Sequence, residues 1–111
     1  MANGTYSGGG TTGIITWSGT SCSFVQTKES SSTNVNSSYV SAPRWYASHK
    51  VTFTANTGYN LTKVVVVCTS NDYASALQKS TFSTGAGATV SGSTVTITTS
   101  GDFSVTMGAQ S

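Results

Sequence analysis

The residues that could carry out acid–base or nucleophilic catalysis are few in this chain. It has one histidine and three acidic residues: His49, Glu29, Asp72 and Asp102. A Ser-His-Asp site would need one of these acids beside His49, and the G-x-S-x-G turn that often exposes the serine is missing from the sequence. Because His49 lies between Ser48 and Lys50, it is predicted to be a surface residue. We therefore predict no catalytic residues and no enzymatic activity.

Metal and cofactor sites have little support in the sequence. Three scattered acids are too few for a calcium site or for the paired carboxylates of a glycosidase. Cys22 and Cys68 have no other metal-ligating residues nearby. Both lie in phase with apolar neighbours, so they could form one disulfide between two sheets, or be two small buried apolar side chains. We predict no metal and no cofactor.

A cluster of aromatic and cationic residues is the best candidate for a binding site. It consists of Tyr39, Arg44, Trp45 and Tyr46, and it follows the long polar loop of residues 28–44. Aromatic rings can stack on sugars or anchor protein interfaces, and an arginine adds directed hydrogen bonds. Alternatively, Trp45 and Tyr46 fill the core of the domain or close one end of it.

The composition indicates an all-β domain that could position these residues. The 111 residues suffice for one domain with a modest core, and they include 20 serines, 20 threonines and 12 glycines. Threonine favours strands, serine and glycine favour turns, and good helix formers are scarce. One all-β domain is therefore predicted.

Charge and hydropathy exclude two classes of partner. The net charge is only +2, and the five basic residues are scattered, so neither nucleic acid nor a membrane surface is an expected partner. No apolar run reaches the roughly 18 residues of a membrane-spanning helix. The first residues, MANGTYSGGGTTG, do not resemble a secretory signal. The chain is therefore predicted to be a virion protein made in the host cytoplasm, or alternatively an extracellular or cell-surface domain excised from a secreted protein.

Residues 45–70 are predicted to form the centre of the fold as two strands around a turn. Val51 and Phe53 alternate with threonines, which is the pattern of a strand with one solvated face. Residues 61–68 are almost uninterrupted apolar residues. Because such runs are typical of strands covered on both faces, residues 63–69 are predicted to lie at the centre of the sheet packing.

The remaining segments complete a predicted sandwich. Residues 1–13 are expected to be a leader that is flexible or ordered by a partner, and residues 14–111 a single domain. Residues 71–79 form the helical candidate, with Asn71 or Asp72 as cap and with Tyr73, Ala76 and Leu77 on one face. The fold class is predicted to be an Ig-like or jelly-roll-type antiparallel β-sandwich of about seven or eight strands with one short helix.

Residues 39–111 resemble a β-sandwich accessory module of secreted and cell-surface proteins of Bacteroidetes, and related phage structural proteins. The resemblance is carried by the aromatic pair after Pro43, the strand–Gly58-Tyr59–strand unit and the V-S-G-x-x-V-T-I hairpin of residues 90–97. It implies a non-catalytic module. Modules of this kind continue past Ser111 into one more strand. Either this module is complete without that strand, or a sheet edge is open to self-association or to another structural protein chain.

Two functions are expected from these observations. The first is a structural or assembly module, most specifically a virion surface subunit of a phage (head decoration, fibre or tail). The second is a carbohydrate-binding or adhesion module of a secreted or cell-surface bacterial protein, with a glycan bound by the aromatic cluster.

Overall fold

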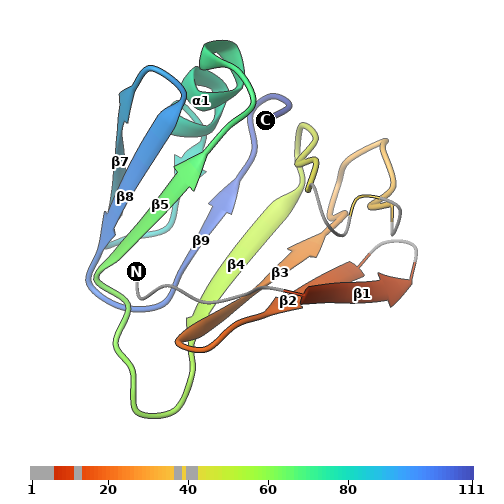
Figure 1. The fold of residues 1–111 in the computed structure, drawn as a ribbon. Coiled ribbons are helices and arrows are strands. Elements are labelled where there is room, and N and C mark those ends of the chain that lie inside the picture. The colour runs from red at the N-terminus through yellow and green to blue at the C-terminus, as the bar shows by residue number, and fades with distance from the viewer. Residues whose placement is uncertain (1–6, 12–13, 37–38, 40–42) are drawn as a thin grey trace.

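Two antiparallel sheets packed face to face make up the described part of the chain, which in this computed structural model comprises residues 7–11, 14–36, 39 and 43–111 (Figure 1). The six-stranded sheet has the order β1-β2-β3-β4-β9-β6, and the three-stranded sheet has the order β5-β8-β7. The elements are β1 Ser7–Thr11, β2 Ile14–Ser18, β3 Cys22–Thr27, β4 Lys50–Ala55, β5 Lys63–Val67, α1 Asn71–Gln78, β6 Thr81–Phe82, β7 Ala86–Ser91, β8 Thr94–Thr99 and β9 Phe103–Thr106. The predicted all-β sandwich with one short helix is confirmed.

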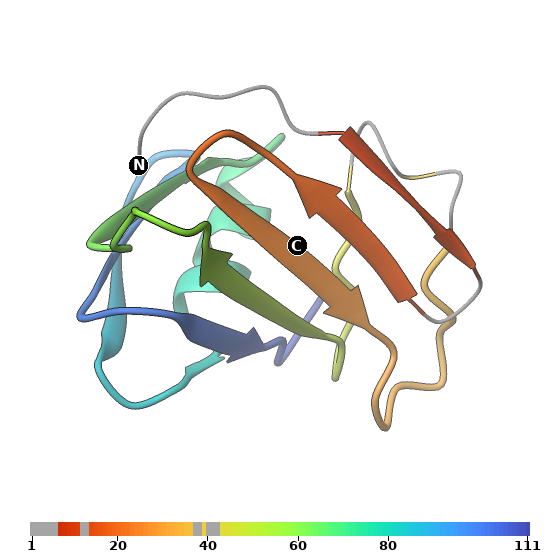
Figure 2. The same ribbon diagram turned by 90° about the horizontal axis from the view of Figure 1, so that it is seen from below.

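A row of four aromatic rings crosses the inner face of the larger sheet, whose central strands lie side by side in Figure 2. The strand register places Trp17 opposite Phe24, Phe24 opposite Phe53, and Phe53 opposite Phe103. Neighbouring ring centres are 4.9, 5.0 and 4.8 Å apart, and each pair is stacked. Such cross-strand pairs stabilise a sheet and fix its register, because a slip of one residue would turn the rings to solvent.

The two strands predicted around the turn, β4 and β5, lie in different sheets and do not pair with each other. β4 pairs with β3 and β9 in the larger sheet, whereas β5 pairs with β8 in the smaller sheet. The segment around Gly58, where φ is +88°, therefore carries the chain from one sheet to the other. Glycine suits this position because other residues are strained at positive φ.

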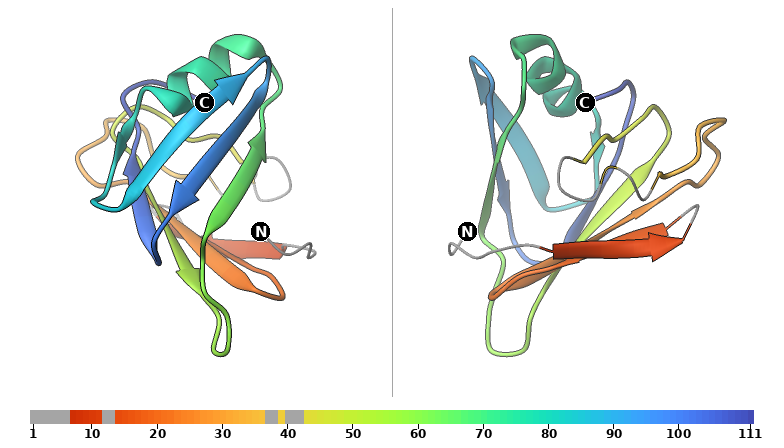
Figure 3. Two further views of the ribbon diagram at one scale, coloured as in Figure 1. Left: turned by 90° about the vertical axis from the view of Figure 1, so that its left-hand side faces the viewer. Right: turned by 45° about the vertical axis from the view of Figure 1, so that its right-hand side comes forward.

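The prediction that residues 63–69 form a strand covered on both faces is wrong. In the described residues β5 is an edge strand, with Val64 buried and with Val65 and Val67 exposed by 41% and 73%. Val64 faces the core, while Val65 and Val67 lie on the outer face, where the described chain places no further layer over them (Figure 3). Valine favours strands on either face, so the apolar run could not distinguish the two arrangements.

The predicted helix is confirmed as α1, which lies between the two sheets at one end of the sandwich (Figure 3). Its buried residues are Ala74 and Leu77, whereas Tyr73 is exposed, so its apolar face is rotated from the predicted one. The cap is Ser70 rather than Asn71 or Asp72. No helix in the described ranges is long and apolar enough to cross a membrane.

Removal of the Ser70 hydroxyl should lower the free energy of unfolding by about 1 kcal/mol. The Ser70 side chain accepts a hydrogen bond of 3.1 Å from the Tyr73 N–H, which would otherwise lack an acceptor in the first turn. Urea denaturation of Ser70→Ala measures the loss. Ser70→Asp is the control and should retain most of the stability, because its carboxylate can also cap the helix. An equal loss in both variants would contradict the capping role.

Part of the predicted leader is a strand of the same chain. Ser7–Thr11 forms β1 and pairs with β2, from Ser7 opposite Ser18 to Thr11 opposite Ile14. Its three central residues are glycines, so this segment has no alternation of apolar and polar residues from which a strand could be predicted. The rest of the predicted leader, residues 1–6 and 12–13, lies outside the described residues.

Candidate functional site

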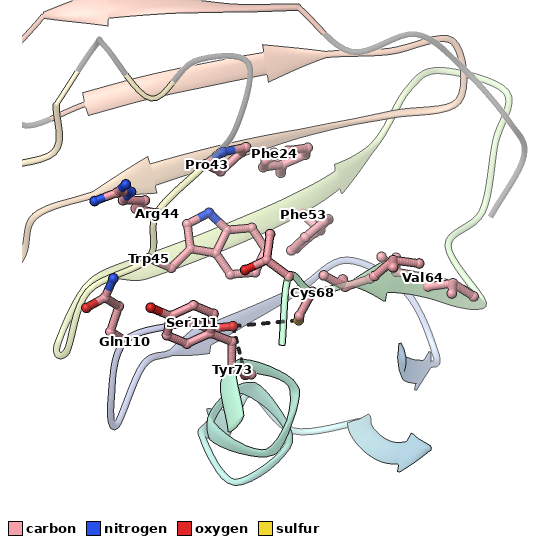
Figure 4. A pocket seen from close by; sticks show the side chains of 14 residues that line it. Phe24, Pro43, Arg44, Trp45, Phe53, Val64, Cys68, Tyr73, Gln110 and Ser111 are labelled. Atoms are coloured by element: carbon pink, nitrogen blue, oxygen red, sulfur yellow. Dashed lines mark hydrogen bonds between the residues drawn. The ribbon is translucent and has the colours of Figure 1, made fainter. Parts of the chain in front are cut away.

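A cavity of about 730 Å³ lies between the sheets on the side of β5 (Figure 4). The helix α1 packs against β7 and β8, and its residue Tyr73 reaches the cavity wall. The larger sheet contributes two aromatic rings to the wall, the smaller sheet contributes its edge strand, and the chain end contributes two residues. The lining residues are Phe24, Pro43, Arg44, Trp45, Phe53, Val64, Val65, Val66, Val67, Cys68, Thr69, Tyr73, Gln110 and Ser111.

The cavity runs along the edge of β5 rather than against one of its faces. Six consecutive residues, Val64 to Thr69, line it. Side chains alternate between the two faces of a strand, so a cavity against a single face would be lined by every second residue. An edge presents the backbone and the side chains of both faces. Consecutive residues of the strand therefore line a cavity that runs along its edge.

The backbone groups of β5 that point toward this edge can be identified from the pairing with β8. The Cys68 N–H donates to the Ser93 carbonyl on the β8 side, at 2.8 Å. Backbone groups of an antiparallel strand point alternately to its two sides. The N–H and C=O groups of Val65 and Val67 therefore point away from β8, toward the free edge.

Trp45 forms part of the cavity wall and also of the core. It is only 7% exposed, and its ring makes edge-to-face contacts with Phe24 and Phe53 at centroid distances of 6.2 and 6.3 Å. Its backbone is held by two hydrogen bonds with Ser111, of 3.1 and 2.9 Å. The indole Nε1 is buried and finds no hydrogen-bond acceptor in the described chain. Buried donors are usually paired, so this nitrogen is the least satisfied group in the site.

The other predicted binding residues have different positions. Arg44 lies at the cavity, and its guanidinium carbon is 4.3 Å from the centre of the Tyr39 ring. A hydrogen bond to the Tyr46 side chain, together with the nearby Tyr39, raises the pKa of Arg44 above its ordinary value. The Tyr46 ring packs edge-on against His49 at 5.6 Å. The structure thus brings Arg44 and Trp45 to the cavity, and Tyr39 and Tyr46 to Arg44.

The sequence does not predict the wall from the smaller sheet. The run of valines indicates a covered strand, although the same run is compatible with an edge. The sequence also does not indicate that Gln110 and Ser111 line a cavity. Ser111 Oγ donates to the Tyr73 carbonyl at 3.0 Å and lies 3.8 Å from Cys68 Sγ. These contacts hold the end of the described chain against the cavity.

Cys22 and Cys68 form no disulfide with each other in this structure. Cys22 is buried in the core, and Cys68 is half-buried and packs against the same core. Their position matches the alternative of two small apolar side chains. Cys68 also lines the cavity, where its sulfur faces Ser111 (Figure 4).

The prediction that His49 is a surface residue is wrong, because the side chain is fully buried. Its Nδ1 accepts hydrogen bonds from Gln26 Nε2 at 2.8 Å and from the Tyr46 N–H at 3.3 Å. Its Nε2 lies 2.7 Å from the Thr33 carbonyl and donates to it. Since Gln26 Nε2 also donates to the Arg44 carbonyl at 2.7 Å, this network positions the segment that carries Arg44 and Trp45.

The reason for this burial is a local change in backbone direction. Ser48 has φ of +69°, and the His49 N–H donates to the Tyr46 carbonyl, so the chain turns just before β4. The turn directs the imidazole inward, although its sequence neighbours are polar.

Within the described ranges, no group of three or more His, Cys, Asp and Glu side chains could hold a metal ion.

Comparisons with known proteins identify no relative of this chain. No protein-family model matches it, and neither curated proteins nor solved structures give a match. The resemblance to accessory modules of Bacteroidetes proteins and phage structural proteins therefore stays a prediction, and functional inference depends on the geometry of the site.

Proposed function

We propose that this chain is a non-catalytic assembly module that joins another protein chain at the free edge of β5. The observation that carries the proposal is the cavity beside that edge, which is lined by six consecutive residues of the strand and its continuation. Unpaired edge groups are a template on which an extended segment can add as a further strand.

The side chains of the edge support this proposal. Edge strands commonly avoid association through charged residues or proline. β5 has one charged residue, Lys63 at its start, and it exposes Val65 and Val67. An exposed apolar edge of this kind is more typical of a contact surface than of a free surface.

The biological setting that we propose is the virion surface, where a small module of low net charge would serve as a decoration, fibre or tail subunit. The carbohydrate-binding alternative has less support from the geometry. Sugar stacking needs an accessible aromatic face, whereas Trp45 is buried and Arg44 covers the Tyr39 ring. Assembly through β5 is therefore the preferred function.

Val65→Pro should weaken strand addition at least tenfold while leaving the pairing with β8 intact. The Val65 N–H points to the free edge, and proline is tolerated in edge strands where the N–H faces outward. The probe is a fluorescein-labelled hexapeptide amide, Thr-Val-Thr-Val-Thr-Val, with binding measured by fluorescence anisotropy. Light scattering of the protein across concentration reports self-association with the same variants.

The matched control is Val65→Thr, which keeps the N–H and should bind the peptide within about threefold of the natural chain. A second control is the same peptide N-methylated at alternate residues, which keeps its side chains but loses donors along one edge. Urea midpoints of both variants check the fold. Equal binding by Val65→Pro and Val65→Thr would contradict strand addition at β5. So would unchanged binding of two N-methylated peptides, one methylated at its odd and one at its even residues.

A further inference from the structure

Resting on the proposed function, we infer that the cavity recognises an extended peptide by three features: an apolar side chain, a hydrogen-bond acceptor and a carboxylate. The apolar side chain packs against the wall that Trp45, Phe53 and Val64 form together. The acceptor meets Trp45 Nε1, and the carboxylate binds Arg44. The inference thus gives the cavity a specific ligand class, beyond the general capacity of β5 to accept a strand.

The first feature follows from the cavity wall. Its inner surface is formed by the rings of Phe24, Trp45 and Phe53 and by Val64, all of which belong to the core or pack against it. A strand added to β5 would lie about 4.8 Å from it, with every second side chain directed toward the larger sheet. The volume of about 730 Å³ lies within the usual range of ligand sites and is large enough for such side chains.

The second feature follows from the Trp45 side chain. An indole N–H is a donor only, so it needs an acceptor to be satisfied. Nε1 is buried, has no acceptor in the described chain, and belongs to a ring in the middle of the lining side chains (Figure 4). A carbonyl or side-chain oxygen of a bound segment would supply the missing acceptor once the side chains that cover Nε1 shift to admit it.

The third feature follows from charge. Among the described residues that line the cavity, Arg44 is the only one with a charged side chain, so no acidic side chain there neutralises it. The Arg44 side chain is exposed, and its guanidinium is held over the Tyr39 ring. A planar guanidinium can bind a carboxylate through two parallel hydrogen bonds. The bound segment is therefore expected to be anionic near Arg44, through an acidic side chain or a C-terminal carboxylate.

The test compares three fluorescein-labelled hexapeptides that differ only in charge. They are the Thr-Val-Thr-Val-Thr-Val amide, the same peptide with a free C-terminal carboxylate, and an amide with aspartate at the fifth position. At least one anionic peptide should bind about tenfold more tightly than the neutral amide. The free-acid and aspartate peptides distinguish the two sources of the carboxylate.

Two variants assign these effects to residues. Arg44→Gln changes an exposed side chain and should abolish the preference for the anionic peptides over the neutral amide. Trp45→Phe keeps an aromatic ring but removes the N–H, and all three peptides should bind about threefold to tenfold less tightly. In a Trp17→Phe background Trp45 is the only tryptophan, and its emission should shift to shorter wavelength when the peptide excludes water.

The outcomes separate this inference from the proposed function. If all three peptides bind equally and Arg44→Gln has no effect, the recognition inference is overturned while strand addition stands. If no peptide binds, or if Val65→Pro binds like the natural chain, the proposed function itself fails. Should Trp45→Phe not fold, the Arg44→Gln comparison and the emission shift of Trp45 still decide the result.

Discussion

Phe53→Ala should remove about 3–5 kcal/mol of the free energy of unfolding, which is a large share of the total for a domain of this size. Phe53 is buried at the centre of the aromatic row, stacked between Phe24 and Phe103 and in edge contact with Trp45. Truncation would leave a cavity that three neighbouring rings cannot easily fill. The urea midpoint, followed by tryptophan fluorescence and circular dichroism, measures the loss.

The matched control is Thr54→Ala, one residue further along β4, where the side chain is exposed on the opposite face. Its stability should stay within about 0.5 kcal/mol of the natural chain. Phe53→Leu should lie between the two, since it retains apolar volume but loses ring stacking. A Phe53→Ala variant as stable as the Thr54→Ala control would show that the aromatic row does not organise the core.

His49→Leu should lower the free energy of unfolding by about 3 kcal/mol, although leucine has a similar size. The substitution leaves Gln26, the Tyr46 N–H and the Thr33 carbonyl without their buried partner, and each such loss typically costs 1–3 kcal/mol. The segment that carries Arg44 would also lose part of its support, because Gln26 connects it to His49. Equilibrium urea unfolding is again the measurement.

A double-mutant cycle with Gln26→Leu tests the network directly. Replacing both partners by apolar groups removes the unsatisfied Gln26 donor that the single His49→Leu variant creates. The double variant should therefore lose clearly less stability than the sum of the two single losses. Strictly additive losses would contradict the direct coupling of the two side chains.

The fold could be predicted where a local pattern corresponds to one structural solution. The alternation around Val51 and Phe53 has the period of a strand with one buried face, and β4 has that arrangement. The segment after Ser70 has the spacing of a short helix, and α1 follows it within one residue. In both cases the chain itself determines the periodicity, and the tertiary context changes only details such as the cap.

The candidate site could be predicted only in part. The sequence predicts Arg44 and Trp45 as candidate binding residues, with core packing as the alternative for Trp45; both line the cavity, and Trp45 also belongs to the core. The β5 wall was not predicted, because an apolar run has the same sequence at the centre and at the edge of a sheet. His49 was misplaced because the turn at Ser48 overrides the alternation expected from its neighbours. The shape of a cavity between two sheets depends on the distance and angle between them. The local sequence pattern of one strand does not determine either quantity.

The order of strands in the larger sheet has a consequence for the synthesis of the protein. β9 lies between β4 and β6, and it supplies Phe103, the last ring of the aromatic row. During translation Phe53 would leave the ribosome well before its neighbour Phe103 exists, with one side of its ring facing water. The row is completed by a contact between segments 50 residues apart, and such distant contacts form slowly. The newly made chain therefore depends on β9 to complete the aromatic row, and chaperones have most reason to act in that interval.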